Sequence, residues 1–180
     1  MASINGVSLK AIKTFRGHEG EPLAQGNIYI DDKKVGFWSQ DAWGGSDNYM
    51  ADGPKIKLFE LIKERAIKFK EGCPKNGKYH ILDGEPDIFM SRLMNLTDDE
   101  KTWKKYRKQG YPYLVVVTDN RKVIMSAFKS RVSGDKFGAE QAETETKQGN
   151  HKFKYYVYSN PEDFNVTVNK THKAPTYLVH

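Results

Sequence analysis

The stretch Tyr113-Leu114-Val115-Val116-Val117-Thr118 places four aliphatic residues in a row directly after a Tyr-Pro-Tyr segment. An unbroken aliphatic run of this kind is typical of a strand buried on both faces, because a half-exposed strand alternates apolar and polar residues. Asp119-Asn120-Arg121 then predicts a turn, and Val123 to Phe128 is expected to return as the second strand of a hairpin. The C-terminal part of the chain is therefore predicted to be built on a β-sheet.

The first fifty residues also have the composition of strands and turns. Val7 to Phe15 mixes apolar residues with lysines, as a half-buried strand does. Asn27–Ile30 and Lys34–Trp38 predict a β-hairpin that turns at Asp31-Asp32-Lys33. Two later strands are predicted at Lys152–Tyr158 and Asn165–Val168.

Helical signals occupy the middle of the chain. Pro54 opens a predicted helix, with Asp52 or Gly53 as its N-cap, and Gly72 followed by Pro74 ends it. A short helix is predicted from Pro86 or Asp87 to Asn95. Thr97-Asp98-Asp99-Glu100 matches a capping box and predicts a separate helix that ends at Gln109. This order of elements predicts an α+β fold, in which a mixed or antiparallel sheet of about five to six strands packs with two to three helices.

One segment of the C-terminal part of the chain is poor in large apolar groups. Residues 130–150 are mostly polar, which predicts a long, mobile excursion that can include one helical turn near Glu140 to Glu145. The end, Lys173 to His180, is expected to be loosely held. Because 180 residues with 12% aromatic residues can bury a core of their own, residues 1–180 are predicted to form a single domain.

The composition also limits the environment of the protein. No window contains the eighteen or so consecutive apolar residues of a membrane span, and the first ten residues do not resemble a signal peptide. Cys73 is the only cysteine, which excludes an internal disulfide and a zinc site built from cysteines. The five histidines share no ligand spacing such as His-x-x-x-His. We therefore expect a cytoplasmic protein with no membrane contact, no metal and no cofactor.

No complete catalytic motif is present. The sequence contains no Gly-x-Ser-x-Gly, no Walker loop and no dinucleotide fingerprint. Asp83, Glu85 and Asp87 set three carboxylates two residues apart, a spacing that could hold Mg²⁺. Glu145-Thr146-Lys147 is similar to half of a nuclease site, but that half belongs on a buried strand and the flanking residues here are polar. Asp87 is interpreted instead as an acid at the start of a helix.

The net charge of +6 is concentrated on two predicted helices. Residues 55–70 carry six lysines and arginines against two glutamates, and residues 101–108 carry five against none. Clustered lysines on a helix attract a phosphate backbone, although they can also be merely solvated, with Trp103 and Tyr106 beside them as core anchors. The residues predicted to bind nucleic acid or another partner are Lys63, Lys70, Lys101, Lys104, Lys105 and Lys108.

A second candidate site lies in two glycine-containing loops near the N-terminus. Glycines allow a backbone to approach a ligand closely, and two tryptophans could wall a pocket. Alternatively, the loops are two tight turns whose tryptophans fold onto the hydrophobic face of the sheet. The residues predicted to bind a ligand are Arg16, His18, Trp38, Asp41 and Trp43.

The residues LKAIKTFRGHEG at 9–20 and GNIYIDDKKVG at 26–36 resemble the beginning of small uncharacterised proteins carried by phages and conjugative elements. The resemblance covers the first fifty residues or so and transfers no functional residue. It implies a setting in which small non-enzymatic proteins bind and block a host machine that handles nucleic acid.

These patterns predict a non-enzymatic binding protein whose partner is nucleic acid or a protein that handles nucleic acid. The rival hypothesis is an enzyme or a small-ligand-binding protein that uses the Arg16/His18 and Trp38/Trp43 loops. A third hypothesis, a structural part of a larger assembly, predicts an exposed apolar patch of more than a few hundred Å².

Overall fold

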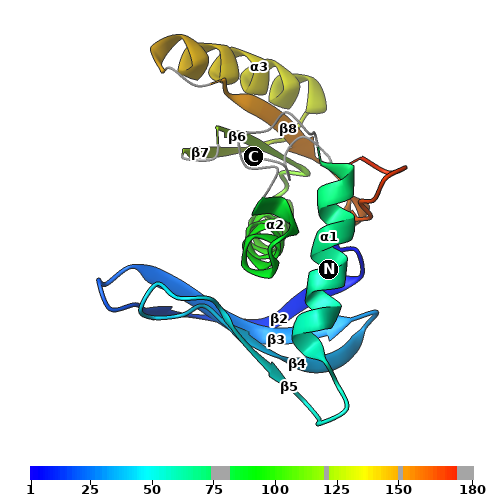
Figure 1. Ribbon diagram of the computed structural model, residues 1–180. Helices are drawn as coiled ribbons and strands as arrows, with labels where there is room; N and C mark the ends of the chain where they lie inside the picture. The colour runs from blue at the N-terminus through cyan, green and yellow to red at the C-terminus, as the bar shows by residue number, and fades with distance from the viewer. Residues whose placement is uncertain (74–81, 120–121, 150–151, 174–180) are drawn as a thin grey trace. The chain divides into compact units, whose positions relative to one another are not determined.

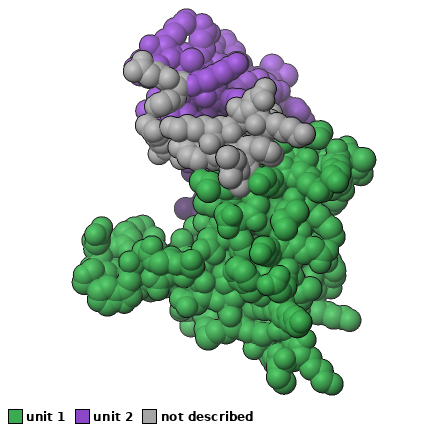
Figure 2. All heavy atoms as spheres, viewed as in Figure 1, with its two compact units in different colours: residues 1–97, 165–174 green, residues 98–164, 175–180 purple. Residues whose placement is uncertain are grey.

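The computed structural model describes residues 1–73, 82–119, 122–149 and 152–173 (Figure 1). They form helices and two β-sheets, so the predicted α+β fold is confirmed. The chain divides into two compact units (Figure 2): unit 1 comprises residues 1–97 and 165–174, and unit 2 comprises residues 98–164 and 175–180. The single domain stays a prediction, and all but the first residue of the predicted loose end, from Lys173 onward, lies outside the described residues.

Unit 1 is built on a six-stranded sheet in the order β5-β4-β3-β2-β1-β9. All neighbours are antiparallel except β1 and β9, which are parallel. The predicted hairpin of β3 and β4 is confirmed, and its turn places Asp31 and Asp32 at φ 47° and 63°, the left-handed conformation that suits a tight hairpin. The strands are β1 (Ser3–Ile4), β2 (Val7–Arg16), β3 (Pro22–Ile30), β4 (Lys33–Ser39), β5 (Asn48–Ala51) and β9 (Asn165–Val166).

Two helices cover one face of this sheet, α1 (Leu58–Gly72) and the first half of α2 (Pro86–Lys108) (Figure 1). Phe69 of α1 meets Phe89 of α2 edge to face, with ring centroids 5.8 Å apart. α1 begins later than predicted because residues 53–56 form a turn, in which the Ile56 N–H donates to the Gly53 carbonyl. The core of unit 1 includes Val7, Leu9, Ala24, Ile28, Trp38, Leu58, Ile62, Ala66, Phe69, Phe89, Met90 and Leu93.

α2 is one continuous helix, so the prediction of two helices separated at Thr97 was wrong. The Thr97 hydroxyl donates to the Leu93 carbonyl one turn earlier, at 2.8 Å, and therefore does not cap a new helix. Leu96 and Trp103 on either side of it are buried. Burial of apolar residues on both sides of Thr97 outweighs the local capping signal, because tertiary packing supplies most of the stability of a helix. No helix among the described residues has the length and apolar character needed to cross a membrane.

Asn5 joins three segments of unit 1. Its Nδ2 donates to the Arg65 carbonyl of α1 at 3.2 Å, and its Oδ1 accepts the Val168 N–H at 2.7 Å. The Asn5 N–H donates to the Val166 carbonyl of β9 at 2.9 Å. Asn5 is buried and has φ 50°, a conformation that asparagine tolerates better than most residues.

We expect Asn5→Ala to lower the free energy of unfolding by about 2 to 4 kcal/mol, because it leaves the buried Val168 N–H without its acceptor and strains the backbone. Urea unfolding followed by circular dichroism measures this loss. Asn5→Gly removes the same hydrogen bonds but suits the positive φ, so it should cost less than Asn5→Ala. An Asn5→Ala variant as stable as the parent protein would contradict the prediction.

Unit 2 places β6 (Tyr113–Thr118) between β7 (Val123–Phe128) and β8 (Lys154–Tyr158) in an antiparallel three-stranded sheet. This central position explains the aliphatic run, since Leu114 to Val117 are each at most 1% exposed. α3 (Arg131–Gln148) covers one face of the sheet, where Val115, Val117 and Ala142 belong to a shared core (Figure 1). A second aromatic cluster is formed where Phe164 packs on Trp103 and stacks on Tyr158.

α3 occupies the segment that was predicted to be a mobile excursion at 130–150, and that prediction was wrong. The buried side of α3 consists mainly of small residues, Gly134, Gly138 and Ala142. A β-carbon added to Gly138 would lie 2.2 Å from the Tyr155 ring, so the helix backbone rests directly on β8. A helix that packs through glycine and alanine lacks the large apolar residues by which helices are recognised in a sequence.

Candidate functional site

A cavity of about 660 Å³ lies along the C-terminal half of α1 in unit 1. Residues from three segments line it: α1, the short 3-10 helix η1 (Leu82–Gly84) with Glu85 after it, and the residues that follow β9. We call this cavity the basic groove. Its described lining residues are Lys63, Ile67, Lys70, Glu71, Gly84, Glu85, Lys170 and Lys173.

The α1 wall of the basic groove follows from helical geometry. Lys63, Ile67 and Lys70 are separated by four and then three residues, so they lie on one side of the helix. Ile67 is 45% exposed and adds an apolar surface between the two lysines. The Lys70 side chain lies close to Gly84, where a β-carbon would be 2.9 Å from Lys70 Cδ and 3.7 Å from Nζ. The absence of a side chain at Gly84 therefore allows the Lys70 stem to lie against η1.

The opposite wall is a tight turn at residues 169–172. Asn169 Oδ1 accepts the N–H groups of Thr171 and His172 and the Thr171 hydroxyl, at 2.8 to 2.9 Å. This turn lies against the end of α1, because a β-carbon on Gly72 would be 2.8 Å from the Asn169 carbonyl oxygen and 3.0 Å from that of His172. Lys170 thus lies in a turn that packs on α1, and Lys173 follows this turn directly.

The charge of the basic groove is positive. Its described lining contains four lysines and two glutamates, a formal net charge of +2. Lys170 pairs with Glu71 at 3.4 Å, whereas Lys63 and Lys173 form no ion pair with any residue that the structure describes. The C-terminal end of a helix carries a partial negative charge, so the lysines must supply the attraction for an anion. The basic groove can therefore hold an anionic group beside an apolar surface.

A neighbouring cavity of about 650 Å³ shares Glu71 and Lys170 with the basic groove. The cationic side chains that line this second cavity are already engaged in ion pairs and hydrogen bonds. Arg65 donates to the Asn5 carbonyl at 2.8 Å and pairs with Asp31 at 3.2 Å. Lys68 pairs with Glu64 one turn earlier in α1, at 2.6 Å. The basic groove is therefore the better candidate for an anion.

The predicted basic surface of the second helix is partly neutralised. Lys101 pairs with Asp98 at 2.8 Å, and Lys104 pairs with Glu100 at 2.7 Å. Lys105 and Lys108 are exposed, and neither forms an ion pair within the described part of the chain. These four lysines belong to unit 2, whereas Lys63 and Lys70 belong to unit 1. Of the six predicted partner-binding lysines, two therefore line the basic groove.

Of the five residues that were predicted to bind a small ligand, the structure separates Trp38 from the other four, which lie in or directly beside two adjoining loops. Trp38 is fully buried in the core, and its indole N–H donates to Asp47 Oδ2 at 2.7 Å. Trp43 is 76% exposed and stacks on His18, with ring centroids 4.1 Å apart. The two tryptophans therefore do not wall a common pocket. Arg16 and Asp41 bond to the loops themselves, Arg16 to the Gly20 carbonyl and Asp41 to the N–H groups of Trp43 and Gly45.

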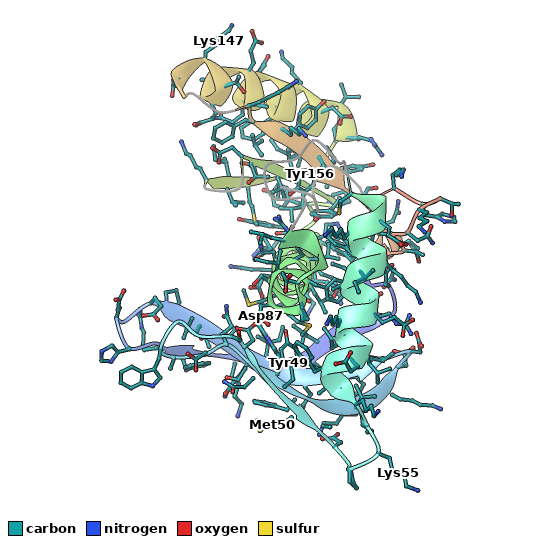
Figure 3. The ribbon with its side chains drawn as sticks, viewed as in Figure 1. Tyr49, Met50, Lys55, Asp87, Lys147 and Tyr156 are labelled. Atoms are coloured by element: carbon teal, nitrogen blue, oxygen red, sulfur yellow. The ribbon has the colours of Figure 1, made fainter. Side chains whose placement is uncertain are left out.

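A carboxylate cluster joins β5 to the start of α2 (Figure 3). Asp87, in the first turn of α2, accepts the Tyr49 hydroxyl at 2.8 Å and the Asp47 N–H at 3.0 Å. Burial raises the pKa of Asp47 to about 6, and the nearby Asp87 charge adds to this effect. Burial and the hydrogen bond to Asp87 also raise the pKa of Tyr49. These bonds hold the loop before β5 on the helix, which gives the cluster a structural role.

The other acidic candidates whose side chains the structure describes do not assemble into a metal or nuclease site. Among residues 1–73, 82–119, 122–149 and 152–173, no three histidine, cysteine or acidic side chains are placed to hold a metal ion. The Asp83 side chain lies outside this description. Glu145 lies on α3 rather than on a strand, and both of its carboxylate oxygens accept from Lys122, at 2.9 and 2.8 Å.

Comparison with models of known protein families, with curated proteins and with solved structures finds no match. Functional inference for this chain therefore depends on its own geometry. Sequence reasoning identified Lys63 and Lys70 but missed Lys170 and Lys173. The run Asn169-Lys170-Thr171-His172-Lys173 is visibly basic, but only the tertiary fold brings it to α1.

Proposed function

We propose that this protein is a non-enzymatic binding protein whose ligand is nucleic acid, held by its phosphate groups in the basic groove. The observation that supports the proposal is the convergence of Lys63 and Lys70 of α1 with Lys173, about a hundred residues later in the sequence, on one cavity. Lysines that neutralise phosphates release condensed counterions, and this release drives association at low salt. The single cysteine and the nature of the ligand favour a cytoplasmic location.

Removing three groove charges should weaken binding. We expect Lys63→Gln/Lys70→Gln/Lys173→Gln to reduce the affinity for a labelled oligonucleotide by about 10- to 100-fold at low salt. The slope of log K against log salt should become shallower by about 2 for a single strand, since three phosphate contacts are lost. Fluorescence anisotropy at several salt concentrations, with DNA and RNA, gives both quantities.

A variant of equal charge provides the control. Lys33, Lys55 and Lys57 are exposed in unit 1 and do not line the basic groove. The triple variant Lys33→Gln/Lys55→Gln/Lys57→Gln removes the same charge and should bind nearly as well as the parent. If both triple variants lose affinity equally, the groove has no special role and the proposal is wrong. Absence of binding to any nucleic acid at low salt would also reject it and would favour a protein partner.

A further inference from the structure

Trp43 differs from the other two tryptophans of the chain. Trp38 is fully buried and Trp103 is 2% exposed, whereas Trp43 is 76% exposed. One face of the Trp43 indole is covered by the His18 imidazole, at a centroid distance of 4.1 Å and an interplanar angle of 26°. An indole with this exposure leaves most of its other face to solvent. The pair therefore offers a flat aromatic surface, which we call the stacking platform.

Hydrogen bonds of the two supporting loops hold the stacking platform in place. Asp41 Oδ2 accepts the N–H of Trp43 at 3.0 Å and that of Gly45 at 2.8 Å. Gly44 between them has φ 79°, a conformation that suits glycine and allows this tight turn. The His18 N–H donates to the Ala42 carbonyl at 2.9 Å and so ties the two loops together.

The turn that carries His18 is fixed as well. Arg16 Nη1 donates to the Gly20 carbonyl at 2.7 Å, and the Gly17 N–H donates to the Glu21 carbonyl at 2.9 Å. Because both loops are already ordered, a ring that stacks on Trp43 loses little affinity to the ordering of the protein. This preorganisation distinguishes the platform from a tryptophan on a disordered loop.

We infer that the stacking platform receives an unpaired nucleobase, so that the nucleic acid bound by this protein is single-stranded. This inference rests on the proposed function. A base has a π-face that stacks on an aromatic side chain regardless of its identity, whereas bases in a duplex are already stacked on their neighbours. The supporting segments 16–21 and 41–45 carry Glu19, Glu21 and Asp41 against Arg16, a formal charge of −2, which disfavours phosphate there. The two sites thus divide the ligand: the basic groove takes phosphates and the platform takes a base.

Intrinsic fluorescence tests this inference directly, because Trp43 is the one exposed tryptophan of the three. A long oligothymidylate should quench Trp43, and an abasic oligomer with the same number of phosphates should not. Trp43→Ala should reduce the affinity for oligothymidylate by about 5- to 100-fold and leave the affinity for the abasic oligomer unchanged. Trp43→Phe retains an aromatic face and should bind at an intermediate level while showing no quenching.

Met50→Ala is the matched control, since Met50 is another exposed apolar residue of unit 1, 55% exposed, and should bind like the parent. The inference is overturned if Trp43→Ala binds oligothymidylate as tightly as the parent, or if duplex DNA quenches Trp43 as strongly as the single strand. The proposed function fails separately: in that case the groove triple variant binds like the parent although Trp43→Ala loses affinity.

Discussion

Replacing Gly138 by alanine is expected to lower the free energy of unfolding of unit 2 by about 2 to 3 kcal/mol, a large effect for one methyl group. The new β-carbon would lie 2.2 to 2.9 Å from three atoms of the Tyr155 ring, which is closer than van der Waals contact allows. The ring cannot move freely because Tyr155 belongs to β8 and packs against the core beneath α3. The helix must therefore move away from the sheet, and contacts along α3 are lost.

Alanine has a higher intrinsic helix propensity than glycine, so this preference alone would make Gly138→Ala stabilising. The effect of helix propensity must therefore be measured separately. Ala139 is the next residue of α3 and is exposed, so Ala139→Gly reports this preference without a packing change. We expect Ala139→Gly to cost about 1 kcal/mol. Tyr155→Val, which removes the ring, should restore part of the stability of Gly138→Ala in a double variant. Chemical unfolding and hydrogen exchange of α3 amides measure these effects, and a Gly138→Ala variant more stable than the parent would refute the packing argument.

The second large effect is a loss of stability with rising pH that originates at Asp99. This residue is buried on α2 and accepts the Tyr158 hydroxyl at 2.9 Å. Burial, with a smaller contribution from the charge of Asp98, raises its pKa to about 6 against the opposing effect of the Tyr158 hydrogen bond. An unfolded aspartate has a pKa of about 4, so the folded protein binds the proton more tightly. The stabilisation is complete below about pH 4 and is lost as the pH rises through about 6.

The size of this loss of stability follows from the difference between the pKa values of Asp99 in the folded and the unfolded protein. Each unit of pKa corresponds to about 1.4 kcal/mol, so the contribution of Asp99 to the free energy of unfolding should fall by about 2 to 3 kcal/mol between pH 4 and pH 7. Asp99→Asn keeps an acceptor for Tyr158 and cannot ionise. It should therefore be more stable than the parent at pH 7 and should lose this part of the pH dependence. Identical profiles for the parent and Asp99→Asn in urea unfolding would show that Asp99 does not cause the loss.

Asp47 of unit 1 acts in the same direction, since burial raises its pKa to about 6 as well. It is only half buried, and solvent screening reduces its contribution to about 1 kcal/mol. An Asp47→Asn variant therefore serves as an internal comparison for Asp99→Asn. The Trp38 indole N–H, which donates to the Asp47 side chain, keeps an oxygen acceptor both in the parent and in Asp47→Asn.

Strands were predicted well because their signals are local. The run at 114–117 indicated a strand buried on both faces, and Asp31-Asp32-Lys33 marked a hairpin, as the structure confirms. Both signals depend on the residues of the element itself and its immediate turn. The sequence could not indicate that the strands divide between two sheets, because this depends on pairing between distant segments such as β1 and β9.

Helices and sites were predicted less completely, for two physical reasons. α3 packs mainly through Gly134, Gly138 and Ala142, so its buried face has few large apolar residues. Thr97 resembles an N-cap in the sequence, but its hydroxyl donates to the Leu93 carbonyl within α2. The basic groove needs Lys170 and Lys173, which follow α1 by about a hundred residues and reach it only through the turn beside Gly72. Trp38 is buried on β4, whereas Trp43 is exposed in the loop between β4 and β5, and a pattern of glycines and tryptophans does not distinguish these two positions.

The central place of β6 has a consequence for how the chain folds. Its neighbour β7 follows after a short turn, whereas β8 is reached only after the whole of α3. Nearby segments pair faster than distant ones, so the β6–β7 hairpin forms while the other edge of β6 is still without a partner. During that interval the most aliphatic strand of the protein is open to pairing with other chains. Rapid formation of α3 shortens this vulnerable period, because it delivers β8 to the open edge.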